Sequence, residues 1–322
     1  MREKLQACLL LVMGIVAWAL PAQASTDTLA QANSALQAGE ADTALSLLDS
    51  LPPSAEVHNL RCRVFFTLEQ WDAAATECQQ AVNLEGQNSD YHMWLGRALG
   101  EKADRASFLS AFSMAKRARA EFEEAVQLDA RNAPAMADLG EFYYEAPGVV
   151  GGGADKADQV AAELDRLDPE RAHELRGRTA ESRKDYATAE RELKLALATS
   201  KHPAYRWMTL ASFYYRHERW SEMNSALRSG VKAEEADRQA AVALFNGASM
   251  LAQHNLEPSF AVEMFRQYLA SAAKSEEAPA FVAYTRLARL EASLGDLGGA
   301  RRGRVAALGL AHSYRPALEL KF

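Results

Sequence analysis

A period of about 34 residues runs along this chain and constrains its fold more than any other feature. It is clearest in two adjacent stretches, Glu170–Pro203 and Ala204–Asp237, which have a small residue at their eighth position, Gly177 and Ala211 respectively. Periods of this length are typical of stacked helical hairpins. Small residues recur where the two helices of a hairpin cross, because a short side chain lets the backbones approach to packing distance. Each hairpin buries its apolar face only against its neighbours, so the period predicts an all-α solenoid.

The residues within the period resemble those of the tetratricopeptide repeat (TPR) family. Its pattern is an aromatic, Leu-Gly and Tyr on the first helix of a unit, then Ala, an aromatic and Ala on the second helix, and a Pro near the end. One unit matches at Trp207, Leu210, Ala211, Tyr214, Met223, Leu227 and Gly230, and another at Leu139, Gly140, Tyr143, Ala157, Ala161, Leu164 and Pro169. Weaker matches complete about eight units, approximately 25–54, 55–88, 89–132, 133–169, 170–203, 204–237, 238–275 and 280–313. The resemblance implies an elongated, right-handed superhelical solenoid of roughly sixteen helices.

The first 24 residues have the pattern of a cleavable secretory signal peptide. Arg2 and Lys4 form a short basic region, and Cys8–Leu20 is an apolar run too short to span a bilayer comfortably. Small residues, Ala22 and Ala24, then stand at the two positions that determine cleavage. We expect cleavage after Ala24 and a periplasmic or secreted protein. No later apolar stretch approaches membrane-spanning length, so stable membrane insertion is not expected.

The charge of the chain argues against nucleic-acid binding. The formal net charge is −7 at pH 7, and no basic stripe with interleaved aromatic residues occurs. The C-terminal end is basic, with Arg286, Arg289, Arg301, Arg302, Arg304, Arg315 and Lys321. A solvated last helix is the favoured interpretation of this end, and docking to an acidic partner or a membrane surface is the alternative.

Nothing in the sequence predicts catalysis, a metal site or a cofactor. Zinc-hydrolase, paired-cysteine and nucleophile-elbow motifs are absent from the sequence. His58, His92 and His173 fall at the fourth position of their units, where Trp207 stands in another, so we expect them to pack between helices. An enzyme is therefore the least supported function.

Glycines are concentrated in the segment Gly148–Gly153, which precedes a predicted helix over 154–167. Backbone N–H groups at such a place bind anions in phosphate-binding loops. Those loops continue with Lys-Ser/Thr, whereas Ala154-Asp155 follows here. A hairpin loop is the favoured interpretation, and an anion cradle or a flap over a bound partner are the alternatives.

The TPR resemblance also implies which positions face the concave groove, namely the second, fifth, ninth, twelfth and thirteenth of each unit. The ninth position is arginine in four units, at Arg63, Arg97, Arg178 and Arg289. Other groove positions carry Phe66, Met93, Tyr144, Tyr205, Met208 and Tyr215. Arginine with aromatic residues and Met is typical of protein-binding surfaces, because guanidinium binds a carboxylate in two places while it stacks on a ring. The alternative is that these arginines pair with carboxylates such as Glu141, Glu174 or Glu181 on neighbouring helices and stabilise the stack.

The favoured function is an exported scaffold or adaptor that binds a protein or peptide in the groove, and the arginines there make an acidic partner one option. A transport-accessory protein that holds a small molecule in a closed apolar pore is the alternative. The sequence leaves the partner and the oligomeric state open.

Two cysteines, Cys62 and Cys78, remain after the predicted cleavage, and both lie in one unit. They occupy facing small positions of an antiparallel pair of helices, which brings Cα atoms within the ~4.4–6.8 Å that a disulfide requires. We expect a disulfide in an oxidising compartment, with two buried free thiols as the alternative.

Overall fold

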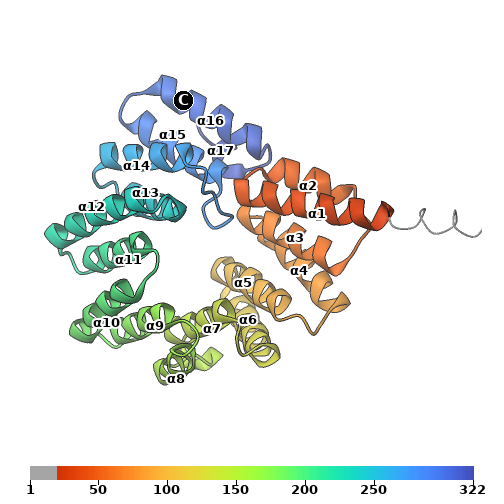
Figure 1. Cartoon of the computed structure of the whole chain (residues 1–322), viewed down its shortest axis with the longest axis horizontal. Coiled ribbons are helices and arrows are strands. Elements are labelled where there is room, and N and C mark those ends of the chain that lie inside the picture. The colour runs from red at the N-terminus through yellow and green to blue at the C-terminus, as the bar shows by residue number, and fades with distance from the viewer. Residues whose placement is uncertain (1–19) are drawn as a thin grey trace, which may run out of the picture.

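The computed structural model describes residues 20–322, and all of the regular elements in that part of the chain are helices (Figure 1). In chain order they are α1 (Leu20–Ala38), α2 (Ala41–Asp49), α3 (Ala55–Thr67), α4 (Trp71–Leu84), α5 (Ser89–Arg105), α6 (Phe108–Leu128), α7 (Ala133–Glu145), η1 (Gly148–Val150), α8 (Ala154–Leu164), α9 (Pro169–Ser182), α10 (Tyr186–Thr199), α11 (Pro203–Arg216), α12 (Trp220–Ala236), η2 (Arg238–Ala240), α13 (Val242–Gln253), α14 (Pro258–Ala270), α15 (Ala280–Ser293), α16 (Leu297–Leu310) and α17 (Arg315–Leu318). The predicted signal peptide, 1–24, lies mostly outside the described residues.

Successive helices pair as hairpins, from α1 with α2 to α15 with α16, and each hairpin packs on the next. The predicted all-α helical repeat solenoid is confirmed. Small residues stand where the helices cross. A Cβ atom on Gly96 would lie less than 3.0 Å from the Phe122 ring, and one on Gly140 would lie less than 3.0 Å from Leu175. A larger residue at either position would push the helices apart.

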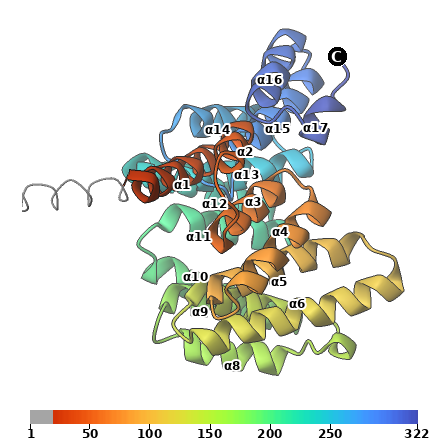
Figure 2. The same cartoon turned by 90° about the vertical axis from the view of Figure 1, so that its right-hand side faces the viewer.

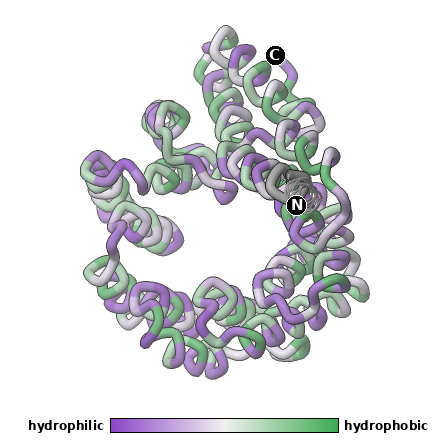
Figure 3. The backbone as a smooth tube through the Cα atoms, turned by 45° about the vertical axis from the view of Figure 1, so that its right-hand side comes forward, coloured by the Kyte–Doolittle hydropathy of each residue, from purple (hydrophilic) through white to green (hydrophobic). Residues whose placement is uncertain are grey.

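The solenoid closes into a ring, so the elongated shape expected from the sequence is wrong (Figures 1 and 3). One hydrophobic core runs from residue 180 to residue 317 and continues into residues 32–68. Arg63 donates to the Glu276 carboxylate from Nε at 2.9 Å and from Nη2 at 2.6 Å, and Gln37 Nε2 donates to the same carboxylate at 3.0 Å. Tyr314 donates to Glu69 at 2.8 Å. Each hairpin is rotated relative to the one before it, and over eight hairpins the rotation brings the last hairpin against the first.

A glycine lies against the backbone of another hairpin at the closure. Gly39, between α1 and α2, has φ +76° and lies against the backbone nitrogen of Ala280. A Cβ atom there would lie less than 3.0 Å from that nitrogen. The position therefore requires glycine twice, for the backbone angle and for the close approach.

The third hairpin is longer than its neighbours. α6 has 21 residues and α4 has 14, and the connection between α5 and α6 lies at the right-hand edge of Figure 2. The extra residues that the sequence places in this unit therefore extend its two helices.

Candidate functional site: the inner groove of the ring

Two of the four predicted groove arginines are held in pairs with carboxylates. Arg63 makes the two-point contact with Glu276 at the ring closure. Arg97 makes another with Asp138, from Nε at 2.6 Å and from Nη2 at 3.2 Å, and its guanidinium lies 4.6 Å from the centre of the Trp94 ring. Two-point pairs fix the guanidinium and satisfy the carboxylate. These two arginines follow the structural alternative considered from the sequence, although their partners are different carboxylates from those expected.

The other two arginines are less constrained. Arg178 lies 3.9 Å from Glu181, one turn along the same helix, which is a weak contact. Arg289 is exposed and donates to the carbonyl oxygen of Pro316 at 3.3 Å. The four arginines therefore do not act as one row.

The apolar groove positions divide into two groups. Four remain half-buried, namely Phe66, Tyr144, Tyr205 and Tyr215. Met93 and Met208 are only 6% and 3% exposed, so their assignment to the groove surface is wrong. Met208 fills the space above Gly230 and Gly247, where a Cβ atom would meet its side chain at 2.6 and 2.7 Å. Glycines on the next helices thus draw this long, flexible side chain into the core.

A cleft of about 460 Å³ lies between α5, α6 and α7 and is bordered by η1. Aromatic and apolar side chains form much of its wall, namely Phe66, Phe122, Phe142, Ala103, Ala115, Pro147 and Val150. The polar side chains are Arg97, Glu101, Asp104, Asp138, Glu141 and Glu145. The cleft combines an apolar surface with convergent charged groups, which is the usual composition of a binding site.

The net charge of the cleft is negative. Arg97 is its only basic residue and is paired with Asp138, while Glu101 pairs with Arg105 at 2.6 Å. Within residues 20–322, the side chains of Asp104, Glu141 and Glu145 make no hydrogen bond or ion pair, and only longer-range charge interactions reach them. Three carboxylates thus surround the cleft without a partner.

The surroundings of the cleft raise the pKa of Glu141, Glu145 and Asp138. Burial within the ring, followed by the charges of Glu145 and Asp138, raises the pKa of Glu141 to about 7, although its side chain is open to solvent on one side. Burial also raises the pKa of Glu145, against the opposing charge of Arg178. Burial even raises the pKa of Asp138 despite its pairing with Arg97. Negative charge is therefore unfavourable in the free cleft, and a bound cation would relieve it.

Three glycines of the segment donate their N–H groups within the hairpin and leave them unavailable to an anion. The N–H of Gly151 donates to Gly148 O at 2.9 Å, that of Gly152 to Pro147 O at 3.3 Å and that of Gly153 to Tyr143 O at 2.7 Å. Gly151 has φ +98°, which glycine adopts without strain. The segment is a hairpin loop, as favoured from the sequence, and its Pro147 and Val150 border the cleft.

Three histidines cross-link the two helices of their hairpins. The pairs are His58 with Glu77 at 2.6 Å, His92 with Glu121 at 2.7 Å and His173 with Glu192 at 2.8 Å. They lie between helices as expected, but they act as polar bridges. In the sequence, a glutamate follows both His58 and His173 by 19 residues, and that spacing would have predicted these bridges between helices.

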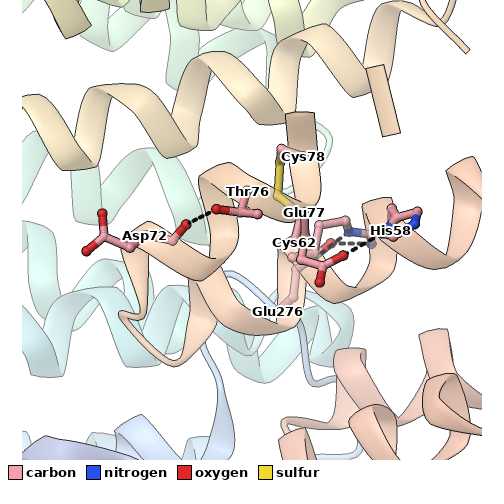
Figure 4. The surroundings of a disulfide bond; sticks show 8 residues. His58, Cys62, Asp72, Thr76, Glu77, Cys78 and Glu276 are labelled. Carbon is pink, nitrogen blue, oxygen red and sulfur yellow. Dashed lines mark hydrogen bonds and ion pairs between the residues drawn. A yellow bond between two sulfur atoms is a disulfide. The ribbon is translucent and has the colours of Figure 1, made fainter. Parts of the chain in front are cut away.

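Cys62 on α3 and Cys78 on α4 are joined by a disulfide, with Cα atoms 5.1 Å apart (Figure 4). Both side chains are fully buried. The bond lies beside the His58–Glu77 bridge, so two cross-links hold this hairpin together.

The described part of the chain shows no group of three or more His, Cys, Asp or Glu residues that could hold a metal ion. Among the helices of residues 20–322, none is long and apolar enough to cross a membrane.

Sequence reasoning considered Glu141 only as a partner of the arginines and missed the other carboxylates of the cleft, although part of the signal was present. Glu141 and Glu145 occupy the ninth and thirteenth positions of their unit, and Glu101 the thirteenth of the unit before. A charge count over the implied groove positions would have found them. Glu276 lies between two units, where the repeat gives no direction, so its pairing with Arg63 had no such signal.

No protein-family profile matches the chain, and no curated protein matches it. Among solved structures, it is similar to a thermophilic TPR protein of Thermus thermophilus, with 16% identity over 64% of this chain and 98% of that chain and a TM-score of 0.46. It is also similar to pilF of Pseudomonas aeruginosa, with 15% identity over 82% of this chain and 95% of that chain and a TM-score of 0.36. The C-terminal part of a TPR repeat-containing protein from Cytophaga hutchinsonii is 14% identical over 78% of this chain and 97% of that chain, with a TM-score of 0.42. At these values the description of the fold rests on the helices of the chain itself.

Proposed function

We propose that this protein is an exported scaffold that acts by binding, and that the cleft between α5, α6 and α7 takes a positively charged side chain of a partner protein. The observation that carries the proposal is the set of three unpartnered carboxylates, Asp104, Glu141 and Glu145, around an aromatic wall. The signal-peptide pattern of residues 1–24 supports export.

A lysine or arginine side chain fits this chemistry at both of its ends. Its alkyl stem packs on apolar surface, and its charged group interacts with aromatic faces and carboxylates. Phe66 and Phe142 supply rings, and Glu141 and Glu145 supply charge. Because a bound cation lowers the raised pKa of Glu141, binding releases protons below about pH 7 and strengthens as the pH rises toward 8.

A basic partner fits the groove better than the acidic one considered from the sequence. At Arg97 and Arg63 an acidic peptide would have to displace Asp138 or Glu276, and each of those contacts has two hydrogen bonds. The charged wall of the cleft likewise differs from the closed apolar pore of a small-molecule carrier.

Titration calorimetry with model peptides tests the binding proposal. The chain from Ser25 onward is titrated with an acetylated peptide of alternating Lys and Ala, and with matched peptides that carry Gln or Glu in place of Lys. We expect the Lys peptide to bind most tightly, with heat that depends on the ionisation enthalpy of the buffer near pH 6.5, where protons are released.

The double variant Glu141→Gln with Glu145→Gln should weaken binding of the Lys peptide about tenfold or more, because a hydrogen bond to a charged group contributes about 1.5–3 kcal/mol. Glu235→Gln with Glu263→Gln is the matched control, since both side chains are exposed and lie outside the cleft. Preference for the Glu peptide, or equal binding by both double variants, would contradict the proposal. Cell fractionation tests export separately, and a full-length product retained in the cytoplasm would refute it.

A further inference from the structure

The first two turns of α6 project beyond the neighbouring hairpins. α6 and α4 end at equivalent positions, Leu128 and Leu84, so the seven additional residues of α6, 21 against 14, form an overhang at its N-terminal end, 108–114. At 1.5 Å per residue the overhang is about 10 Å long. Figure 2 shows this end of α6 at the edge of the molecule, on the side opposite the beginning of α1.

The end of the overhang is apolar and open. Phe108 is 85% exposed and Leu109 is 83% exposed, and they are the two most exposed large hydrophobic side chains in residues 25–322. Phe112 follows one turn later, with the ammonium group of Lys116 4.4 Å from its ring centre. Exposed apolar groups that lie side by side mark an interaction surface more often than scattered ones do.

The residues around this apolar end are basic. The stretch 105–120 contains Arg105, Lys116, Arg117 and Arg119 and no Asp or Glu, in a chain whose net charge is −7. Three of these pair within the helices, whereas Lys116 has no carboxylate partner in the described residues. The pairs are Arg105 with Glu101, Arg117 with Glu121 and Arg119 with Glu123. Two acidic residues, Asp104 and Glu121, flank the basic stretch directly.

We infer that this end of the α5–α6 hairpin docks onto an anionic lipid bilayer, with Phe108 and Leu109 inserted among the headgroups and the basic side chains against the lipid phosphates. An apolar tip followed by a cationic band matches the polarity gradient of an anionic membrane surface. A protein groove would require carboxylates placed to match, whereas a bilayer accepts any arrangement of cations around an apolar wedge. The inference is independent of what the inner groove binds.

Vesicle flotation tests this inference. The chain from Ser25 onward, without the apolar leader, is mixed with vesicles of phosphatidylcholine alone or of phosphatidylcholine with phosphatidylglycerol. We expect flotation with the anionic vesicles only, and its loss at about 0.5 M salt, where charges are screened beyond a few ångströms. The double variant Phe108→Ser with Leu109→Ser should lower the partition coefficient at least tenfold, and Lys116→Gln should lower it severalfold.

The matched control is Val305→Ser with Arg302→Gln on α16. Val305 is 72% exposed and lies in the basic C-terminal region, so this variant tests the other candidate surface. All of these side chains are exposed, so thermal melts should remain unchanged. The inference would be overturned if the protein does not bind anionic vesicles, or if only the α16 variant loses binding. It would also be overturned if the Phe108 and Leu109 variant changes its sedimentation but not its lipid binding. The last result would assign the tip to self-association.

Discussion

Replacing Glu276 by Ala should open the ring. The change removes three hydrogen bonds, two from Arg63 and one from Gln37. The side chains of Arg63 and Glu276 are 18% and 13% exposed, so the pair is closer to the buried limit, where loss of one partner costs about 3–5 kcal/mol, than to the exposed limit of about 0–1 kcal/mol. Arg63 keeps its contact with Asn33, which reduces the loss. We therefore expect a decrease of about 2–4 kcal/mol in the free energy that holds the ring closed.

Two measurements separate opening of the ring from unfolding of its hairpins. Small-angle X-ray scattering should show a larger radius of gyration for Glu276→Ala, and urea unfolding should show lower stability. Glu277→Ala is the control, because the neighbouring side chain is exposed and makes no hydrogen bond or ion pair within residues 20–322. If Glu276→Ala and Glu277→Ala give the same radius and the same unfolding midpoint, the reasoning about the closure is refuted.

Three further outcomes are expected. Gly39→Ala and Gly295→Ala both force alanine into positive φ, +76° and +86°, at a cost of about 1–2 kcal/mol. Because the new Cβ atom meets backbone only at Gly39, Gly39→Ala should lower the melting temperature more, and equal decreases would contradict this. Because the pKa of Glu141 is raised from 4.5 to about 7 in the folded protein, the folded state keeps a proton between these pH values that the unfolded state loses, and stability falls as the pH rises through them. Glu141→Gln should therefore raise the melting temperature at pH 8 and leave it nearly unchanged at pH 4, and a pH-independent effect would argue against the raised pKa. Intact mass should show Cys62 and Cys78 oxidised in exported protein, and reduction should lower the free energy of unfolding by about 3 kcal/mol for a loop of this size, whereas alkylation of both thiols without reductant would exclude the bond.

The hairpins and their crossing points were predictable because they depend on local sequence. Gly96 and Gly140 stand where a Cβ atom would collide with a side chain of a neighbouring helix, and that requirement recurs with the period. The spacing of Cys62 and Cys78 follows from the same geometry, since both lie at the crossing of one antiparallel pair.

The groove surface was only partly predictable. The repeat gives the direction of a side chain, but its exposure depends on what the next hairpin places opposite it. Met208 is buried because Gly230 and Gly247 leave space for it, whereas Tyr215, at another groove position, stays half-buried and stacks on His254. The direction of a side chain depends on its own helix, whereas its burial depends on the residues of the neighbouring hairpins.

By itself the sequence determined the helices, their pairing into hairpins and the positions that must stay small, because each of these depends on residues within one or two periods. Only the tertiary structure decided that the solenoid closes, since closure is the sum of small rotations over eight hairpins and is held by contacts such as that of Arg63 with Glu276, 213 residues apart. It likewise decided that Arg97 is paired and that Glu141 is left without a partner, because the carboxylates of one hairpin meet the cations of another only after stacking fixes the register between them.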